Sequence, residues 1–265
     1  MRVCSHDHER HATKMTDLTG KVALITGSAR GIGKAIALRY AQLGADIVVN
    51  YSGDEANANK TLAEITETGR DAIAIKADMT KVDEIERIFK ETIEKFGKVD
   101  IVVANAGVEL IDQPISEATE EQYDRLFAIN SKGTFFTLQK AAKYVSDNGR
   151  IIYIGSSTTC NPFPSVGLYG SSKMATRYTV AVLAQEIGNR GVTVNTILPT
   201  TIADAGVFTD MGDDHPYHKL METFRPIGGR IGQPSDVADA AEYFASDIAG
   251  WVSGQHLLVS GGAVQ

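Results

Sequence analysis

Two side chains with opposite proton chemistry stand four residues apart in the second half of the chain. Tyr169 and Lys173 are spaced i to i+4, which places both on one face of a helix. A phenol has a pKa of about 10, so it is a poor acid–base group near neutrality. A cation about 4 Å away contributes on the order of 4 kcal/mol at an effective dielectric of about 20, which favours the phenolate. The pair therefore predicts an acid–base tyrosine whose pKa the lysine lowers.

A serine is predicted to reach the same place. Ser156 follows the apolar run 150–155 and precedes Tyr169 by thirteen residues. Open parallel sheets bind ligands at the carboxyl ends of their strands. The Ser156 hydroxyl could hold the oxygen of a substrate carbonyl while the tyrosine protonates that oxygen. A Tyr-x-x-x-Lys pair alone is also common on ordinary helix surfaces, so the serine is the residue that favours catalysis.

A glycine-rich turn after the first apolar run predicts a dinucleotide site. Segment 26–33 reads TGSARGIG and lies between a strand-like run and a helical pattern. Gly27 permits a tight turn, Gly31 lets the backbone approach a pyrophosphate, and Gly33 lets helix and strand pack closely. The N–H groups and positive dipole at the helix N-terminus would then face the diphosphate. The residues of this turn expected to bind the cofactor are Gly27, Ser28, Arg30, Gly31, Ile32 and Gly33.

The end of the second strand favours NADP over NAD. An acidic residue about 20 positions beyond the glycines would bind the ribose hydroxyls of NAD. That region instead holds Tyr51 and Ser52, which we expect to line the cofactor site. Arg30 lies inside the glycine turn, where a guanidinium can bind a 2′-phosphate. Asp54 and Glu55 are the nearest carboxylates, and a longer strand would bring one of them toward the ribose.

Strand-like and helical patterns alternate from about residue 20 onward. The strand-like runs cover 21–26, 46–51, 72–76, 99–104, 150–155, 192–198 and 256–260. The helical patterns cover 34–43, 57–68, 82–96, 119–146, 168–187 and 235–246. Apolar strands joined by helices indicate a parallel sheet that is covered on both faces. We therefore predict an α/β fold: a single-domain Rossmann fold whose doubly wound parallel sheet has about seven strands.

Composition limits the class of partner and compartment. The chain has 265 residues and a formal net charge of −7, which argues against nucleic acid or an anionic membrane as partner. No apolar run approaches the length that a membrane-spanning helix needs, about 20 residues. Two cysteines, Cys4 and Cys160, cannot form a disulfide framework, which favours the cytoplasm. Residues 1–14 are rich in histidine and lack an apolar segment, so we expect a disordered extension rather than a metal site, followed by one domain over 15–265.

From residue 18 to 262 the chain resembles the short-chain dehydrogenase/reductase family. The matching motifs are the glycine turn, Asn105-Ala106-Gly107, Asn130, Ser156, Tyr169-x-x-x-Lys173 and Asn195-x-x-x-Pro199, in the family's order and spacing. The resemblance implies a Rossmann fold, a nicotinamide cofactor and a homotetramer. The chain departs from frequent family residues at Ala104, Thr200, Asp204 and Ser260. None of these is one of the four positions that the resemblance implies to be catalytic, Asn130, Ser156, Tyr169 and Lys173.

The resemblance also implies residue roles. Tyr169 would be the general acid/base, and Ser156 would orient and polarise the carbonyl. Lys173 would hold the nicotinamide ribose, and Asn130 would position a water that relays protons. Asp78 would contact the adenine. The remaining cofactor positions that the resemblance implies are Met79, Asn105, Ala106, Gly107, Pro199, Thr200 and Ile202, the last through its backbone.

The substrate wall is expected from three segments, 109–113, 160–168 and 200–225, with a lid over about 199–232. Its apolar candidates are Phe163, Leu168, Phe208, Met211, Tyr217, Met221 and Phe224. Its polar candidates are Glu109, Gln113, Cys160 and His215. No arginine pair is present there to bind a carboxylate, so the wall suits a neutral, medium-sized ketone.

Three functions remain open at this point. The first is a carbonyl reductase that uses NADPH on a neutral ketone. The second is a 3-oxoacyl-(acyl-carrier-protein) reductase, whose glycine turn and Asn50-Tyr51 strand end are similar. That enzyme needs a basic rim to dock an acidic carrier, and segment 143–150 with Arg177 offers few cations. The third is a non-catalytic NADP-binding protein, which the presence of all four catalytic positions disfavours.

Overall fold

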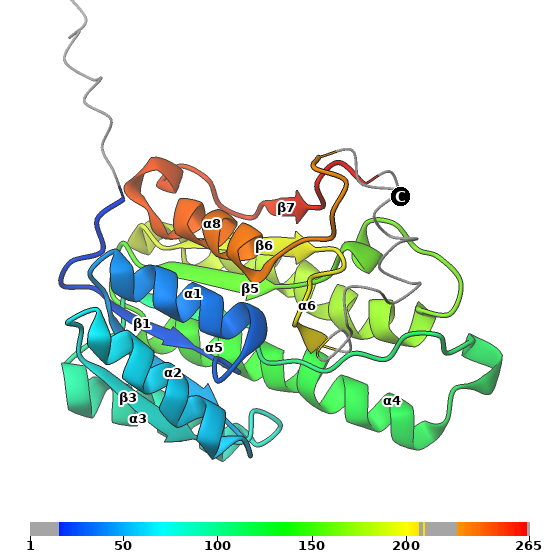
Figure 1. The fold of residues 1–265 in the computed structure, drawn as a ribbon, viewed down its shortest axis with the longest axis horizontal. Coiled ribbons are helices and arrows are strands. Elements are labelled where there is room, and N and C mark those ends of the chain that lie inside the picture. The colour runs from blue at the N-terminus through cyan, green and yellow to red at the C-terminus, as the bar shows by residue number, and fades with distance from the viewer. Residues whose placement is uncertain (1–15, 207–208, 210–226, 264–265) are drawn as a thin grey trace, which may run out of the picture.

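The computed structural model describes residues 16–206, 209 and 227–263. Within them, seven parallel strands form one sheet in the order β3-β2-β1-β4-β5-β6-β7 (Figure 1). The strands are β1 (Val22–Ile25), β2 (Asp46–Tyr51), β3 (Ala72–Lys76), β4 (Ile101–Ala104), β5 (Arg150–Ile154), β6 (Thr193–Pro199) and β7 (His256–Val259). This is the expected doubly wound Rossmann sheet.

Helices cover both faces of the sheet because successive strand residues point to opposite sides. Leu24 and Val48 belong to one apolar core, and their neighbours Ile25 and Val49 belong to the other. The helices over the Ile25 side are α1 (Gly31–Gln42), α2 (Glu55–Glu67) and α8 (Pro234–Ala245) (Figure 1). The helices over the Leu24 side are α3 (Val82–Phe96), α5 (Thr134–Tyr144) and α6 (Gly167–Glu186).

Strand register brings the chemical motifs to one edge. Ile25 of β1 pairs with Val103 of β4, Val103 with Ile152 of β5, and Ile152 with Asn195 of β6. The strands therefore end side by side, and the residues that follow them meet at the carboxyl edge. These residues include the glycine turn after β1, the Asn105 loop after β4 and Ser156 after β5.

The long helical region expected over 119–146 is present, and it contains a widened turn. It consists of α4 (Glu120–Phe127), a π-helical turn, η2 (Ala128–Gly133), and α5. Two tertiary contacts accompany the widened turn. The Asn130 amide bonds to segments outside the helix, and a Cβ on Gly133 would collide with the carbonyl oxygen of Met79. The periodicity predicted the helical region but not this turn, because the tertiary contacts leave no periodicity signal.

Short 3-10 turns complete the connections: η1 (Ile115–Glu117), η3 (Ser157–Thr159), η4 (Gly188–Arg190) and η6 (Asp247–Ala249). Where the expected lid is described, Ile202 bridges Gly232, and the Thr200 N–H donates to the carbonyl of Val259. The extension 1–14 and most of the lid lie outside the described residues. Among the helices described, none has the length and apolarity needed to cross a membrane.

Candidate active site

One large cavity, of about 760 Å³, opens along the carboxyl edge of the sheet. The glycine turn, the loop after β4, the segment after β5, the start of α6 and the segment after β6 all line it. The predicted residues that line it are Gly27, Arg30, Gly31, Ile32, Gly33, Tyr51, Ser52, Asn105, Ala106, Gly107, Ser156, Tyr169, Lys173, Pro199, Thr200 and Ile202. The structure thus brings three of the four predicted catalytic residues and most of the predicted cofactor residues to a single opening.

The glycine turn has the backbone that the sequence predicted. Gly27 and Gly31 have φ of +62° and +56°, the left-handed region in which side chains are strained. A Cβ on Gly33 would lie 2.5 Å from the carbonyl oxygen of Gly27 and 2.6 Å from Nδ2 of Asn105. Helix α1 begins at Gly31, and the side chain of Arg30 makes no capping hydrogen bond. The exposed helix N-terminus fits a diphosphate.

Asn50 holds this turn, although the sequence reasoning did not assign it to the site. Its Oδ1 accepts a hydrogen bond from the Gly27 N–H at 2.9 Å, and its Nδ2 donates to Ala77 O at 3.1 Å. Ser28 faces inward, where its hydroxyl donates to Ile25 O at 2.8 Å and accepts from the Asn50 N–H at 3.1 Å. Ser28 lies outside the cavity lining, because its hydroxyl is occupied in the core.

The cofactor-selecting end of the cavity carries both signs of charge. Arg30 is exposed at the rim, and Asp54 lines the same cavity. Asp54 caps α2 by accepting from Asn57 N at 3.1 Å and from Asn57 Nδ2 at 2.7 Å. These hydrogen bonds lower the pKa of Asp54, and the charge of Arg30 adds a smaller effect in the same direction. This end of the cavity thus holds an exposed guanidinium with a carboxylate close by, and its contact with a phosphate stays a prediction.

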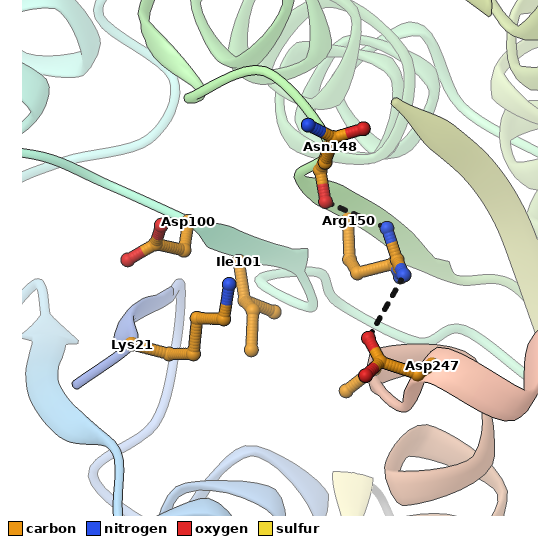
Figure 2. A pocket seen from close by; sticks show the side chains of 7 residues that line it. Lys21, Asp100, Ile101, Asn148, Arg150 and Asp247 are labelled. Carbon is orange, nitrogen blue, oxygen red and sulfur yellow. Dashed lines mark hydrogen bonds and ion pairs between the residues drawn. The ribbon is translucent and has the colours of Figure 1, made fainter. Parts of the chain in front are cut away.

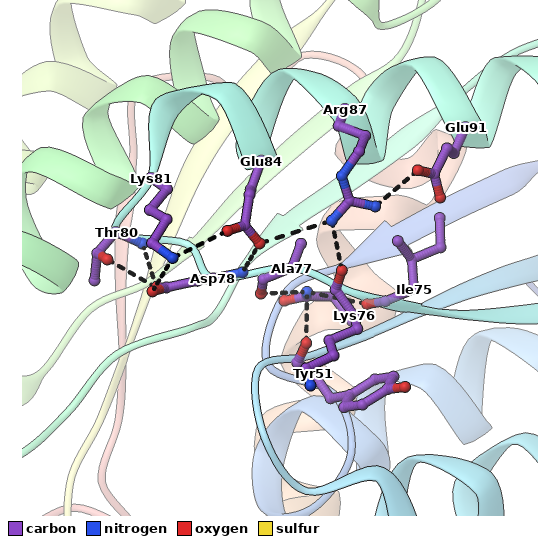
Figure 3. A network of polar contacts seen from close by, with 11 residues as sticks. Tyr51, Ile75, Lys76, Ala77, Asp78, Thr80, Lys81, Glu84, Arg87 and Glu91 are labelled. Carbon is purple, nitrogen blue, oxygen red and sulfur yellow. Dashed lines mark hydrogen bonds and ion pairs between the residues drawn. The ribbon is translucent and has the colours of Figure 1, made fainter.

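The turn after β3 is occupied by its own polar network (Figure 3). The Asp78 carboxylate accepts from the Thr80 N–H at 2.9 Å and from the Thr80 hydroxyl at 2.8 Å. Those bonds lower the pKa of Asp78, with Lys81 contributing less. Neither Asp78 nor Met79 lies on the cavity lining, so their predicted contact with adenine stays a prediction.

The loop after β4 is fixed to the glycine turn. Nδ2 of Asn105 donates to Thr26 O at 2.9 Å and to Gly27 O at 3.0 Å. The Thr26 hydroxyl accepts from the backbone N–H groups of Asn105 and Ala106, both at 3.0 Å. A Cβ on Gly107 would lie 2.9 Å from Lys173 Nζ, so glycine lets the ammonium approach.

Ser156 and Tyr169 line the same cavity, and the Ser156 hydroxyl is near enough to the phenol to lower its pKa. The Ser156 hydroxyl also accepts from the Thr158 N–H at 3.3 Å and from the Thr158 hydroxyl at 2.9 Å. Thr158 lines the cavity as well, although it was not among the residues predicted for the site. A hydroxyl two residues after the serine is the only signal that could have indicated this second donor.

Burial, rather than Lys173, governs the pKa of Tyr169. Desolvation raises that pKa well above its usual value, the Glu109 charge raises it further, and the hydrogen bond with Ser156 lowers it. The Lys173 ammonium donates to Ile154 O at 3.2 Å, and desolvation lowers its pKa to about 8 against an opposing effect of Glu109. The lowering expected from Lys173 is not among the causes of this shift, and desolvation, which opposes it, sets the direction of the Tyr169 pKa.

Asn130 acts on the backbone rather than on the cavity. Its Oδ1 accepts from the Val108 N–H at 2.9 Å, and its Nδ2 donates to Val108 O at 2.8 Å and to the Ser172 hydroxyl at 3.0 Å. Its carbonyl accepts from the Thr176 hydroxyl at 3.0 Å. Asn130 is completely buried and lies outside the cavity lining. The water relay that the family resemblance implies stays a prediction.

The expected substrate wall is reproduced in part. Glu109 and Phe163 line the cavity, whereas Leu168, Gln113 and Cys160 do not. The candidates Phe208, Met211, His215, Tyr217, Met221 and Phe224 lie outside the described residues. Lining residues that the sequence reasoning did not single out include Ile111, Asp112, Asn161, Thr201, Ala205 and Gly206.

A second recess lies at the opposite, amino edge of the sheet (Figure 2). Lys21, Asp100 and Arg150 line it, and its volume of about 20 Å³ has room for about one water molecule. Arg150 Nη1 donates to Asn148 O at 2.7 Å, and its Nη2 lies 3.8 Å from the Asp247 carboxylate. This recess is too small for a substrate. In the described part of the chain, no cluster of side chains is suited to a metal ion.

The fold and site define a nicotinamide-dependent oxidoreductase of the short-chain dehydrogenase/reductase family, to which the chain belongs. The family model described as "Enoyl-(Acyl carrier protein) reductase" matches residues 27–264. The particular relatives agree on this class. A hydroxynaphthalene reductase-like protein, Arp2 of Metarhizium brunneum, is 41% identical over 263 residues, covering 93% of this chain and 96% of the relative.

Solved structures lead to the same family. A Burkholderia cenocepacia short-chain dehydrogenase in complex with NADP is 32% identical, with a TM-score of 0.86 over 93% of this chain and 98% of that chain. The promiscuous reductase LugOII, described as catalysing keto-reduction during lugdunomycin biosynthesis, is 34% identical, with a TM-score of 0.86 over 94% of this chain and all of its own (100%).

Proposed function

We propose that this protein is a carbonyl reductase that transfers hydride between NADP(H) and a neutral ketone or the corresponding secondary alcohol. The observation that carries the proposal is the cavity that the glycine turn shares with Ser156, Tyr169 and Lys173. Keto-reduction by the structural relative LugOII supports the same reaction type.

Each of the cavity side chains would have a separate role in the reaction. When bound, the nicotinamide supplies the hydride that reaches the carbonyl carbon. Ser156 would orient the carbonyl oxygen by hydrogen bonding, with Thr158 fixing the serine hydroxyl. Tyr169 would donate a proton to that oxygen, and its raised pKa keeps the phenol protonated near neutrality. Lys173 would hold the nicotinamide ribose.

A spectrophotometric screen tests the proposed reaction. NADPH and NADH oxidation would be followed with simple and aromatic ketones, diketones, quinones, sugars and acyl thioesters. We expect turnover with NADPH and a neutral ketone. Absence of turnover with every carbonyl would overturn the proposed function.

Cofactor choice rests on Arg30. The Arg30→Ala variant should weaken NADPH binding by about 10- to 100-fold, because charge-assisted hydrogen bonds to the 2′-phosphate are lost. NADH binding should change little. Arg39, on the helix that Arg30 precedes, is a matched control, because it pairs with Glu242 at 2.7 Å and lies outside the cavity lining. Equal losses for both cofactors in fluorescence titrations would contradict the assignment.

Reduction of 3-oxoacyl groups on an acyl carrier protein is the second candidate. The description of the matching family model supports a carrier-linked substrate. The lining carries the carboxylates Asp54, Glu109, Asp112 and Asp204 against the cations Arg30 and Lys173. This excess of carboxylates over cations disfavours the docking of an acidic carrier protein. Faster reduction of acyl-carrier thioesters than of free ketones in the same screen would favour this second function over the first. A non-catalytic NADP-binding role is disfavoured because all four catalytic positions are present.

A cytoplasmic homotetramer is the assembly we propose. The support is family resemblance together with large exposed apolar side chains on α4 to α6, among them Tyr123, Phe135 and Tyr178. Such side chains are typical of surfaces that a partner covers. Gel filtration at micromolar concentration would contradict the proposal if the protein eluted as a monomer.

A further inference from the structure

Glu109 places a carboxylate in the cavity beside the reacting groups. It lies in the loop after β4, is partly buried and lines the same cavity as Ser156 and Tyr169. Its charge reaches both Tyr169 and Lys173, because it raises the pKa of each. The two residues come from α6, so the carboxylate faces the catalytic helix from a separate segment.

The structure fixes the backbone that carries this carboxylate. Val108, which precedes Glu109, has both its N–H and its C=O bonded to the buried Asn130 amide, at 2.9 and 2.8 Å. Val108 and Leu110 on either side pack against the apolar cluster that contains Tyr169. A group held on both sides loses little freedom when it binds a ligand, which favours specific recognition.

Gly206, which follows β6, leaves room for the carboxylate. A Cβ on Gly206 would collide with the Glu109 carboxylate, so the two lining residues are in close contact. Gly206 has φ of +58°, a further reason for glycine at this position. Glu109 thus lies between the catalytic helix and the segment that follows β6.

We infer that Glu109 is a specificity-determining residue that accepts a hydrogen bond from a hydroxyl group on the substrate, away from the reacting carbonyl. This inference rests on the proposed reduction of neutral ketones. A carboxylate has about four acceptor sites, so it can bind a substrate hydroxyl while keeping its contacts within the protein. The same charge disfavours a substrate carboxylate at this position. The substrate class is therefore the hydroxylated neutral ketone, a chemistry compatible with the name of the hydroxynaphthalene reductase-like relative.

Matched acetophenones test the inference. The catalytic efficiency, kcat/KM, would be measured with NADPH for meta- and para-hydroxyacetophenone and for the methylacetophenones of the same substitution. We expect the natural protein to prefer the hydroxyl over the methyl compound by about tenfold or more at one ring position, because a hydrogen bond to a charged acceptor is strong. In Glu109→Gln that ratio should fall about five- to tenfold, and carboxyacetophenone should become a better substrate. Gly206→Ala, which displaces the carboxylate, should lower the ratio as well.

Glu117→Gln is the control. Glu117 lies in η1 of the same connection after β4, but it is exposed and lies outside the cavity lining. Its hydroxyl-to-methyl ratio should stay within about twofold of the natural protein's. Reduction of acetophenones with the same ratio in the natural protein and in Glu109→Gln would overturn this inference while leaving the proposed function intact. A stronger preference for aminomethylacetophenone than for the hydroxyl compound would overturn the choice of a hydroxyl.

Discussion

Two groups of one tyrosine, one lysine and one glutamate occupy different environments in this molecule. In the cavity, Tyr169 and Lys173 lie four residues apart on α6, and Glu109 comes from a separate loop. On the surface, Lys140 and Tyr144 lie four residues apart on α5, and Glu86 comes from α3. The spacing on the helix is the same in both groups.

In the surface group, the charges of Lys140 and Glu86 are paired with each other. Glu86 accepts a hydrogen bond from the Tyr144 hydroxyl and forms an ion pair with Lys140 at 2.7 Å. The hydrogen bond from Lys140 is the main cause, and that from Tyr144 the next, of a Glu86 pKa of about 2. In the cavity, Lys173 is 5% exposed and donates to a backbone carbonyl, and its pKa falls to about 8.

Spacing on a helix alone therefore does not distinguish the proposed catalytic tyrosine–lysine pair from a structural one. The two pairs differ in their burial and in the group that accepts the hydrogen bond of the lysine ammonium. An ammonium that contacts a carboxylate stabilises the fold, whereas an ammonium held by a backbone carbonyl in a cavity keeps donors for a ligand.

The largest expected contrast is in turnover. Tyr169→Phe should lower turnover by about 10²- to 10⁴-fold, because the proton donor is lost, and should leave cofactor binding nearly unchanged. Tyr144→Phe should leave turnover within about twofold and lower the free energy of unfolding by about 1 kcal/mol through the lost hydrogen bond. Steady-state kinetics and urea unfolding measure both. Unchanged turnover in Tyr169→Phe would refute its assignment.

The next contrast is in the pH dependence of stability. Lys173 has a pKa of about 8 in the folded state, against 10.5 as its ordinary value. Between these values the unfolded state binds more protons, so stability from this group rises with pH. Relative to Lys173→Met, the free energy of unfolding should rise by up to about 3 kcal/mol from about pH 7.5 to about pH 10.5. Urea unfolding of the cofactor-free proteins measures this, and parallel profiles would contradict the desolvated ammonium.

The smallest expected effect belongs to the surface group. The pKa of Glu86 is lowered from 4.5 to about 2, so its stabilisation is present above pH 4.5 and is lost as pH falls through about 2. Because the side chain is 20% exposed, solvent screens the pair. Glu86→Gln should therefore cost about 1 kcal/mol at neutral pH and less near pH 2. An equal cost at both pH values would show that the charge of Glu86 is not what stabilises the fold.

The sequence was sufficient for the sheet and for most of the cavity. Periodic apolar runs predicted all seven described strands, and the glycine and tyrosine motifs predicted residues that now line one opening. The inward direction of the Ser28 hydroxyl and the clamp of Asn130 on Val108 depend on contacts between distant segments, which no local pattern encodes. The spacing of Tyr169 and Lys173 gives a pair energy but not the burial of the phenol, and it is desolvation that sets the direction in which the pKa of Tyr169 shifts.

The π-helical turn between α4 and α5 makes the length of this segment critical. Each residue of an α-helix turns the chain by about 100°, and the widened turn takes up one residue more than an α-helical turn. An unbroken α-helix with the same number of residues would therefore rotate α5 by that angle, and Leu138 and Ala141, now in the core beside α3, would turn toward solvent. Homologous chains that lack one residue between Leu126 and Leu138 should instead have a regular α-helix here, with α5 in the same orientation.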